Sequence, residues 1–378
     1  MTRFPANEII ATIEQAPRYD LSSSIGPNLT VGELLDASGQ PSLGHLPLGY
    51  ATAAGDPRLR SAVAAAHGVD PEDVVITVGG MHALFLIAFI LCGPGDEVVT
   101  TSPSFPLARN VLEAVGAKIR TEPLSFDEGY QLRTADFLRH LSAQTKLVSL
   151  ASPQNPSGVA IPISALREVL DAMGRRCPSA YLLVDETYRE AAHGDNSTGD
   201  TALALGPKIL SIASLSKCHG APGLRLGWAI TSDTELREQL VRGKYNTVVS
   251  CSPLDETLAL RLLDERSRIM PGRRRHLAAA LALTNGWIRE NVRFVDWIRP
   301  DGGSICCVRL KPSIFDEAGV RRFYDRLTEQ GIRVGSGTWF GEEPRVFRLG
   351  FGYLSTADLR VALEGIAAVL RQAARAAA

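Results

Sequence analysis

Short apolar runs alternate with longer segments of helical periodicity through the middle of the chain. The run Val74–Val78 precedes a helical pattern at Gly80–Leu91, and the run Tyr181–Asp185 follows one at Ile163–Met173. Runs of β-branched and aliphatic residues predict strands, and a period of about 3.6 residues predicts helices. Further strands are expected at 97–101, 118–123, 146–151, 209–213 and 226–230, and a further helix at 105–115.

Strands that alternate with helices favour an α/β fold with a mainly parallel sheet, covered by helices on both faces. In such a sheet the ligand lies beyond the carboxyl ends of the strands. We therefore look for functional residues at the positions where the expected strands end.

The pattern changes near Leu258, where a long helical stretch rich in arginine and leucine begins. Strands are expected at 292–298, 304–310 and 345–350, a helix at 317–330, and a last amphipathic helix from Thr356. This part of the chain predicts a smaller α+β domain. The basic cluster Arg273–His276 lies within the helical stretch, and we interpret it as a solvated helix face, not as a nucleic-acid site.

Composition narrows the class of protein. The chain has 378 residues, of which 45% are hydrophobic, so it can bury a large core. Its formal net charge of −1 favours neither a nucleic-acid nor a membrane partner. Six scattered cysteines indicate reduced thiols, a cytoplasmic location and no metal site. The N-terminus lacks the apolar core of a signal peptide, and the most apolar run, Ala83–Cys92, is too short to span a membrane.

The run Ser214-Leu215-Ser216-Lys217 stands at the end of the expected strand 209–213. A lysine that reacts with carbonyl groups must be neutral part of the time and must point at a bound aldehyde. Arg225, eight residues later, carries a planar guanidinium suited to a phosphate dianion. Most lysines are solvated surface residues, so this run is informative only together with other motifs.

Other motifs also follow expected strands. Gly79-Gly80-Met81 begins a helix, where backbone N–H groups favour a phosphate, although an ordinary tight turn has the same sequence. Asp185 ends an apolar strand, and a buried carboxylate there needs a partner. Arg348 lies in an otherwise apolar run, where its charge needs an anion.

In their order and spacing, these motifs, with Asn155-Pro-Ser-Gly158 and Tyr188, resemble the class I/II aminotransferases, which are pyridoxal 5′-phosphate (PLP) enzymes of fold type I. The resemblance runs from about Leu21 to about Leu370. It implies PLP as the cofactor, an amino acid and a 2-oxo acid as substrates, and a homodimer with shared active sites. It also implies a large PLP-binding domain at residues 46–260 and a small domain formed by residues 1–45 and 261–378.

The resemblance implies roles for individual residues. Lys217 would form the Schiff base with PLP and move the substrate proton, with Asp185 and Tyr188 as further catalytic residues. The implied cofactor contacts are Gly79, Gly80, Met81, Ser214, Ser216 and Arg225 at the phosphate, Phe105 on the ring face, Asp185 at the ring nitrogen, Asn155 and Tyr188 at the phenolate oxygen, and Tyr50 reaching the phosphate of the partner subunit. The implied contacts of the substrate carboxylate are Gly26, Asn155 and Arg348.

Three functions fit this resemblance. The first is an aminotransferase, the second a PLP-dependent lyase or cyclase that acts at Cβ or Cγ, and the third a non-catalytic PLP-binding regulatory domain. The third is disfavoured because no DNA-binding module precedes Leu21. The aminotransferase is the function that we expect.

The choice of substrate is less determined. The segment Ser22–Leu34 resembles the corresponding segment of a PLP enzyme that eliminates and cyclises a hydroxylated arginine, which makes Asp20, Glu33 and Asp36 candidates to face a guanidinium. Dicarboxylate-specific relatives use a second arginine where this chain has Tyr245–Val249. A preference for aspartate is therefore not indicated, although Lys244 or Arg242 is a candidate substitute.

Overall fold

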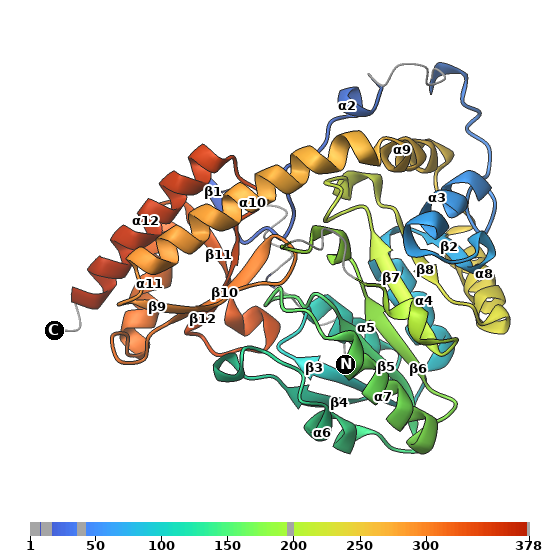
Figure 1. The fold of residues 1–378 in the computed structure, drawn as a ribbon, viewed down its shortest axis with the longest axis horizontal. Helices are drawn as coiled ribbons and strands as arrows, with labels where there is room; N and C mark the ends of the chain where they lie inside the picture. Colours follow the sequence, from blue (N-terminus) through green and yellow to red (C-terminus); the bar gives the residue numbers. More distant parts are fainter. Residues whose placement is uncertain (1–7, 9–16, 36–42, 195–199, 376–378) are drawn as a thin grey trace.

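A computed structural model describes residue 8 and residues 17–35, 43–194 and 200–375. Within this part of the chain, the larger sheet has seven strands in the order β2-β8-β7-β6-β5-β3-β4. All run in one direction except β8, which is antiparallel to both β7 and β2 (Figure 1). The mainly parallel sheet expected from the sequence is confirmed. The strands are β2 (Val74–Thr77), β3 (Glu97–Ser102), β4 (Lys118–Pro123), β5 (Thr145–Ala151), β6 (Tyr181–Asp185), β7 (Ile209–Ser214) and β8 (Gly227–Ile230).

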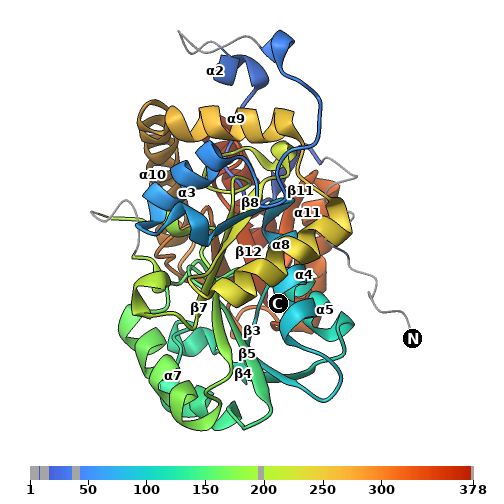
Figure 2. The ribbon, with the colours of Figure 1, turned by 90° about the vertical axis from the view of Figure 1, so that its right-hand side faces the viewer.

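Helices cover both faces of this sheet (Figure 2). Successive side chains of a strand point to opposite faces, so Leu182 packs in the cluster that contains α7 and Leu183 in the cluster that contains α4. This double burial explains why β6 and β7 read as continuous apolar runs. One face carries α4 (Gly79–Leu91), α5 (Pro106–Ala114) and α8 (Thr234–Val248), and the other carries α3 (Pro57–His67), α6 (Thr134–Phe137), α7 (Ile163–Arg176) and α9 (Pro253–Asp264).

A second sheet combines the N-terminal strand with strands from the C-terminal part, in the order β1-β11-β12-β10-β9. Tyr19 of β1 pairs in parallel with Ile332 of β11, and the other pairs are antiparallel. Phe323 and Phe347 lie in the core between this sheet and its helices. The strands are β1 (Tyr19–Leu21), β9 (Val295–Ile298), β10 (Ile305–Leu310), β11 (Ile332–Ser336) and β12 (Val346–Gly350), and the helices are α10 (Arg266–Glu290), α11 (Glu317–Glu329) and α12 (Thr356–Arg375).

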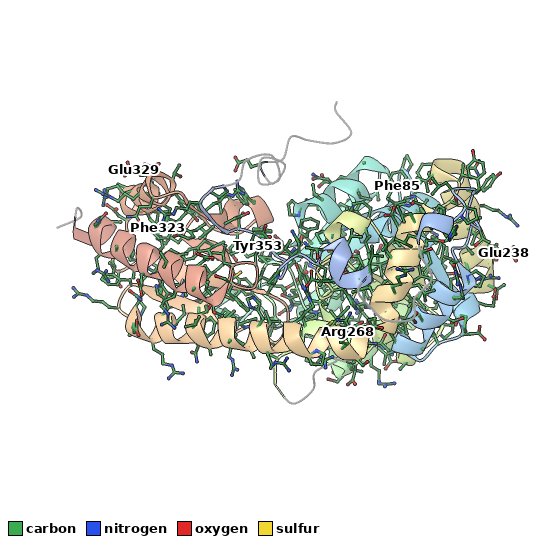
Figure 3. All side chains as sticks on the ribbon, turned by 90° about the horizontal axis from the view of Figure 1, so that it is seen from above. Phe85, Glu238, Arg268, Phe323, Glu329 and Tyr353 are labelled. Atoms are coloured by element: carbon green, nitrogen blue, oxygen red, sulfur yellow. The ribbon has the colours of Figure 1, made fainter. Side chains whose placement is uncertain are left out.

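The long helix α10 joins the two parts of the molecule. It runs from Arg268, near α9, toward the second sheet (Figure 3). Phe323, beside the second sheet, and Phe85, beside the seven-stranded sheet, lie toward opposite ends of the molecule in this view. The division into domains at residues 46–260, and at 1–45 with 261–378, stays a prediction.

Six α-helices and β-strands were not expected from the sequence, namely α2 (Val31–Leu35), α3, α6, α8, β1 and β11. The three residues of β1 are too few for a period to be recognised, and β11 contains Arg333 and Gly335, which interrupt an apolar pattern. The helix α8 is capped by Asp233, whose side chain accepts from the Leu236 N–H, but charged residues and a glycine dilute its apolar face. These elements form because tertiary packing overrides weak local signals.

No helix in the described part of the chain combines the length and the hydrophobicity that crossing a membrane requires. Among the same residues, no group of three or more His, Cys, Asp or Glu side chains is arranged to hold a metal ion. All six cysteines are free.

Candidate active site

The side chains singled out in the sequence meet at one edge of the seven-stranded sheet. Asp185 ends β6, and Lys217, Asn155 and Phe105 follow the ends of β7, β5 and β3. Arg225 precedes β8, and because β8 runs in the opposite direction, its beginning lies at the same edge. Ten of the expected residues line one cavity of about 320 Å³, namely Gly80, Met81, Phe105, Asn155, Asp185, Tyr188, Ser214, Ser216, Lys217 and Arg225. This volume lies within the range of roughly 300–1,000 Å³ that is common for small-molecule sites.

Lys217 forms a hydrogen bond with a residue near the N-terminus of the chain. Its Nζ donates a hydrogen bond of 2.8 Å to Oγ of Ser24. Burial lowers the pKa of Lys217 to about 8, and the positive charges of Arg348 and Arg225 act in the same direction, whereas Asp185 opposes them. A lysine with this pKa is neutral for a substantial part of the time near neutral pH, which reaction with an aldehyde requires.

Asp185 lies beside Lys217 and has one engaged and one open oxygen. Its Oδ1 accepts hydrogen bonds from the backbone N–H of Thr187 at 3.0 Å and from the Thr187 hydroxyl at 2.5 Å. Among the described residues, none donates a hydrogen bond to Oδ2. Burial raises the pKa of Asp185 above its usual range, and the bonds from Thr187 and the charge of Lys217 oppose this only in part. A cationic donor at Oδ2 would stabilise the carboxylate.

The N-terminus of α4 forms one end of the cavity. No side chain caps it, so its first backbone N–H groups are open to an anion. Gly79 has a φ of 75°, and a Cβ at this position would lie 2.9 Å from Nη2 of Arg225. Arg225 donates to the carbonyl oxygen of Pro222 at 2.9 Å and forms no ion pair within the described chain. Ser214 and Ser216 complete this end, which therefore suits a phosphate.

Arg348 approaches the cavity from β12 of the second sheet. Its guanidinium donates to Oδ1 of Asn155 at 2.7 Å and to the carbonyl oxygen of Ser22 at 2.5 Å, and it lies 4.5 Å from the centre of the Phe340 ring. Its side chain is almost completely buried, and Nε has no hydrogen-bond partner in the described structure. Burial lowers the pKa of Arg348. A buried guanidinium without a carboxylate partner is suited to bind a carboxylate from a ligand.

The remaining expected residues are placed differently. Tyr188 is buried, its hydroxyl lies 3.5 Å from the carbonyl oxygen of Ser24, and burial raises its pKa to about 12. Gly26 lines a smaller neighbouring cavity that shares Lys217 and Tyr188 with the main one. Tyr50 does not line either cavity, and 90% of its surface is exposed.

Sequence reasoning missed Ser22, Ser24, Thr187 and Phe340. Thr187 is local to Asp185 and could have been found, because a threonine two residues after a carboxylate commonly donates to it. The contacts of Ser22, Ser24 and Phe340 depend on how the two sheets meet. The one local signal for Ser22 and Ser24 was the run of three serines that precedes Ile25 and Gly26, and no local signal pointed to Phe340.

The residues considered for substrate side chains are mostly engaged elsewhere. Asp20 forms an ion pair with Arg333 at 3.0 Å, and Glu33 accepts from the N–H and the hydroxyl of Thr30. Asp36 lies outside the described residues. Lys244 is completely buried, so it cannot replace the missing second arginine at a partner's site, and Arg242 pairs with Glu238.

Taken together, these groups define a site for a ligand with an anion at one end and a cationic N–H near Asp185. PLP fits this description, because its phosphate suits the open end of α4, its protonated ring nitrogen suits Oδ2 of Asp185, and its aldehyde suits Lys217. Arg348 forms no ion pair within the described structure, so a carboxylate from a substrate would balance its buried charge. The fold is that of a fold-type I PLP-dependent enzyme, and the cavity suits this cofactor.

Comparison with known proteins agrees with this class. The family model "Aminotransferase class I and II" matches residues 20–366, so the chain belongs to this family and its cofactor is PLP. It is 32% identical to capreomycidine synthase of Streptomyces vinaceus over 88% of this chain and 85% of that protein. It is also 27% identical to arginine–pyruvate transaminase of Pseudomonas aeruginosa, over 77% and 75% of the two chains. The crystal structure of the PLP-dependent cyclase OrfR superimposes with a TM-score of 0.85 and 26% identity, over 97% of each chain.

Proposed function

We propose that this protein is an aminotransferase that transfers the amino group of an L-amino acid to a 2-oxo acid, with Lys217 as the residue that carries PLP and moves the substrate proton. The observation that carries this proposal is the group formed by Lys217, Asp185 and Arg348, which combines a lysine of lowered pKa, a carboxylate with an open oxygen and a guanidinium that forms no ion pair within the described structure.

Each residue has a distinct task in this proposal. Arg348 binds the substrate α-carboxylate with two parallel hydrogen bonds, and Asn155, which already contacts Arg348, orients it. PLP, when bound, withdraws electrons from the substrate Cα, and Asp185 keeps the ring nitrogen protonated so that this withdrawal is effective. Lys217, whose lowered pKa leaves part of it neutral near neutral pH, removes the proton from Cα. Tyr188 and Asn155 donate hydrogen bonds toward the cofactor.

A second function remains open, namely a PLP-dependent lyase or cyclase that acts on an arginine-derived amino acid. Two findings favour it. Capreomycidine synthase, which the segment Ser22–Leu34 resembles locally, matches most of the chain, and the neighbour OrfR is described as a cyclase. Both reactions begin with loss of the Cα proton, so the residues described above serve either one.

A single-turnover experiment separates the two functions. The purified enzyme is mixed with one amino acid at a time, without a 2-oxo acid, and the cofactor is released by acid and quantified. The panel includes arginine and 3-hydroxyarginine beside common amino acids. An aminotransferase converts PLP to pyridoxamine phosphate in proportion to the 2-oxo acid formed. A lyase or cyclase leaves PLP unchanged while the amino acid is consumed.

A variant tests the role of Lys217 in either reaction. Lys217→Ala should lower the rate by several orders of magnitude, each factor of ten corresponding to about 1.4 kcal/mol of barrier. Borohydride should attach PLP to the wild-type chain at residue 217 and should attach none to the variant. Labelling of another lysine in the wild-type protein would refute the assignment.

We also propose a homodimer. Tyr50 is exposed, and so are Phe89 of α4 and Tyr245 of α8. These two helices pack against each other, since a Cβ at Gly243 of α8 would lie 3.2 Å from Leu86 of α4. Large apolar side chains exposed on neighbouring helices are typical of a surface that a partner covers. A cytoplasmic location also stays a proposal, and the six unpaired cysteines support it.

A further inference from the structure

The side chain of Ser24 occupies a position in the active site that the motifs of the sequence do not account for. Its Oγ lies 2.8 Å from Nζ of Lys217, and only 8% of the residue is exposed. We propose that Lys217 carries the cofactor and moves the substrate proton. A hydroxyl at this distance therefore affects both the orientation and the protonation of its amine. Among the described residues, no other group accepts a hydrogen bond from this amine.

The backbone around Ser24 is fixed on several sides. The carbonyl oxygen of Ser22 accepts from Arg348, and the carbonyl oxygen of Ser24 itself lies 3.5 Å from the hydroxyl of Tyr188. Just before this segment, β1 pairs with β11. Ser23 passes so close to Gly350 that no Cβ could be accommodated there. The Ser24 hydroxyl is therefore held against Lys217 by contacts that do not involve the hydroxyl itself.

We propose that the Ser24 hydroxyl positions Nζ of Lys217 and stabilises its protonated form by accepting a hydrogen bond from it. A neutral amine that donates one N–H to Ser24 has its lone pair directed elsewhere, and Lys217 lines the cavity that also contains Asp185. A protonated amine forms the stronger hydrogen bond of the two, so the contact favours the charged form. Ser24 is a positioning residue in this account, and the inference rests on the proposed role of Lys217.

Other charges also act on Lys217, and the test must separate them from Ser24. Asp185 on β6 favours the protonated amine, whereas Arg348 on β12 and Arg225 before β8 disfavour it. Cys218 and burial contribute as well. None of these groups is altered when the Ser24 hydroxyl is removed.

The experiment measures the protonation of Lys217 directly. Full-length protein is freed of PLP, and Lys217 is labelled with an amine-specific reagent at a series of pH values and quantified by mass spectrometry. The variants are Ser24→Ala, Ser24→Thr and, as matched control, Ser23→Ala, since the neighbouring Ser23 side chain makes no hydrogen bond within the described structure. Circular dichroism and thermal unfolding verify that each variant is folded.

The labelling curve of Ser24→Ala should move to lower pH, because the charged form loses a charge-assisted hydrogen bond. At a pH below the midpoint, labelling should be roughly tenfold faster than in the wild type. Ser24→Thr and Ser23→Ala should follow the wild-type curve. The pH dependence of PLP recapture should move with the labelling curve.

Two results would overturn the inference. One is a Ser24→Ala curve that coincides with that of the wild type, and the other is a Ser23→Ala curve that moves equally. Borohydride trapping, performed in parallel, keeps the two proposals distinct. If PLP is trapped at Lys217 and the curve does not move, only the role of Ser24 fails. If PLP is trapped elsewhere, the proposed function fails, whatever the curve shows.

Discussion

Arg348 and Asn155, which are 193 residues apart in the sequence, are joined by a hydrogen bond of 2.7 Å that links the two sheets. Asn155 follows β5 of the large sheet, and Arg348 lies within β12 of the small one, opposite Cys307 of β10. The candidate site is thus formed where the sheets meet, with Lys217 and Asp185 on one side and the guanidinium of Arg348 on the other. A substrate carboxylate at Arg348 would contact both parts of the molecule.

The first prediction concerns this guanidinium. Arg348→Lys keeps the charge but loses the planar pair of donors, so binding of amino acids and 2-oxo acids should weaken by roughly 10- to 100-fold. PLP affinity should change little, because the phosphate end is formed by α4 and Arg225. Substrate KM and PLP dissociation are measured separately. Arg225→Lys is the matched control and should show the opposite pattern. Normal substrate binding with loss of PLP in Arg348→Lys would mean that the two roles are exchanged.

Much of the fold could be predicted because its signals are local. The strand β6 has the predicted bounds, since its three central residues are buried between helices on both faces and must be apolar, until the chain reaches Asp185 at the edge. Boundaries of helices were less accurate, and α7 continues to Arg176, beyond the predicted Met173. Its last turn carries Arg175 and Arg176, which leave the apolar period but favour the carboxyl end of a helix.

The site was predictable only in part, for a physical reason. Residues such as Asp185 and Lys217 follow strands of one parallel sheet, and that topology alone brings them together. Ser24 and Ser22 reach the site because β1 pairs with β11, a contact between positions more than 300 residues apart that no local pattern encodes. Ion pairs between distant parts of the chain were equally unpredictable from the sequence, as the pair of Asp20 with Arg333 illustrates.

The second prediction tests the phosphate end of the cavity. Gly79→Ala must place a Cβ 2.9 Å from Nη2 of Arg225 and must keep a φ of 75°, so PLP affinity should fall by at least tenfold. Gly68→Ala is the matched control, because Gly68 has a φ of 68° but nothing lies within 4 Å of its Cβ position. Both variants should lose roughly 1 kcal/mol of stability from the backbone. Equal PLP affinity in the two variants would contradict the role of this turn.

The third prediction follows from the pKa of Lys217, measured on protein without PLP. Burial lowers this pKa from 10.5 to about 8, so below pH 8 the folded state contains a buried charge that costs about 3 kcal/mol as an upper bound. Between these values the unfolded chain binds more protons, and stability therefore rises with pH. Lys217→Met removes the cost, so the variant should be more stable than the wild type at pH 7.

Urea unfolding at several pH values measures this effect. The difference between Lys217→Met and the wild type should shrink as the pH rises from about 8 to about 10.5, because the wild-type lysine is then neutral in both states. Lys208→Met serves as the control, since Lys208 lies over the ring of Tyr181, outside the cavity, and should not produce this pH-dependent gain. If the difference in the free energy of unfolding is constant with pH, burial does not destabilise the protonated form of Lys217.

The last prediction tests whether Tyr50 acts in the partner's active site. Tyr50→Ala should lose much of its activity through weaker PLP binding, and Lys217→Ala should be inactive. When the two variants are unfolded together and refolded, about half of the dimers should be hybrids, and each hybrid contains one site with both Lys217 and a Tyr50 from the other subunit. At a PLP concentration that saturates the wild type but not Tyr50→Ala, activity should therefore recover to about a quarter of the wild-type value. No recovery in the mixture, or a fully active monomer in sedimentation analysis, would mean that each chain forms its site alone. Because 90% of the surface of Tyr50 is exposed in the single chain, the recovered activity would also identify what covers this side chain.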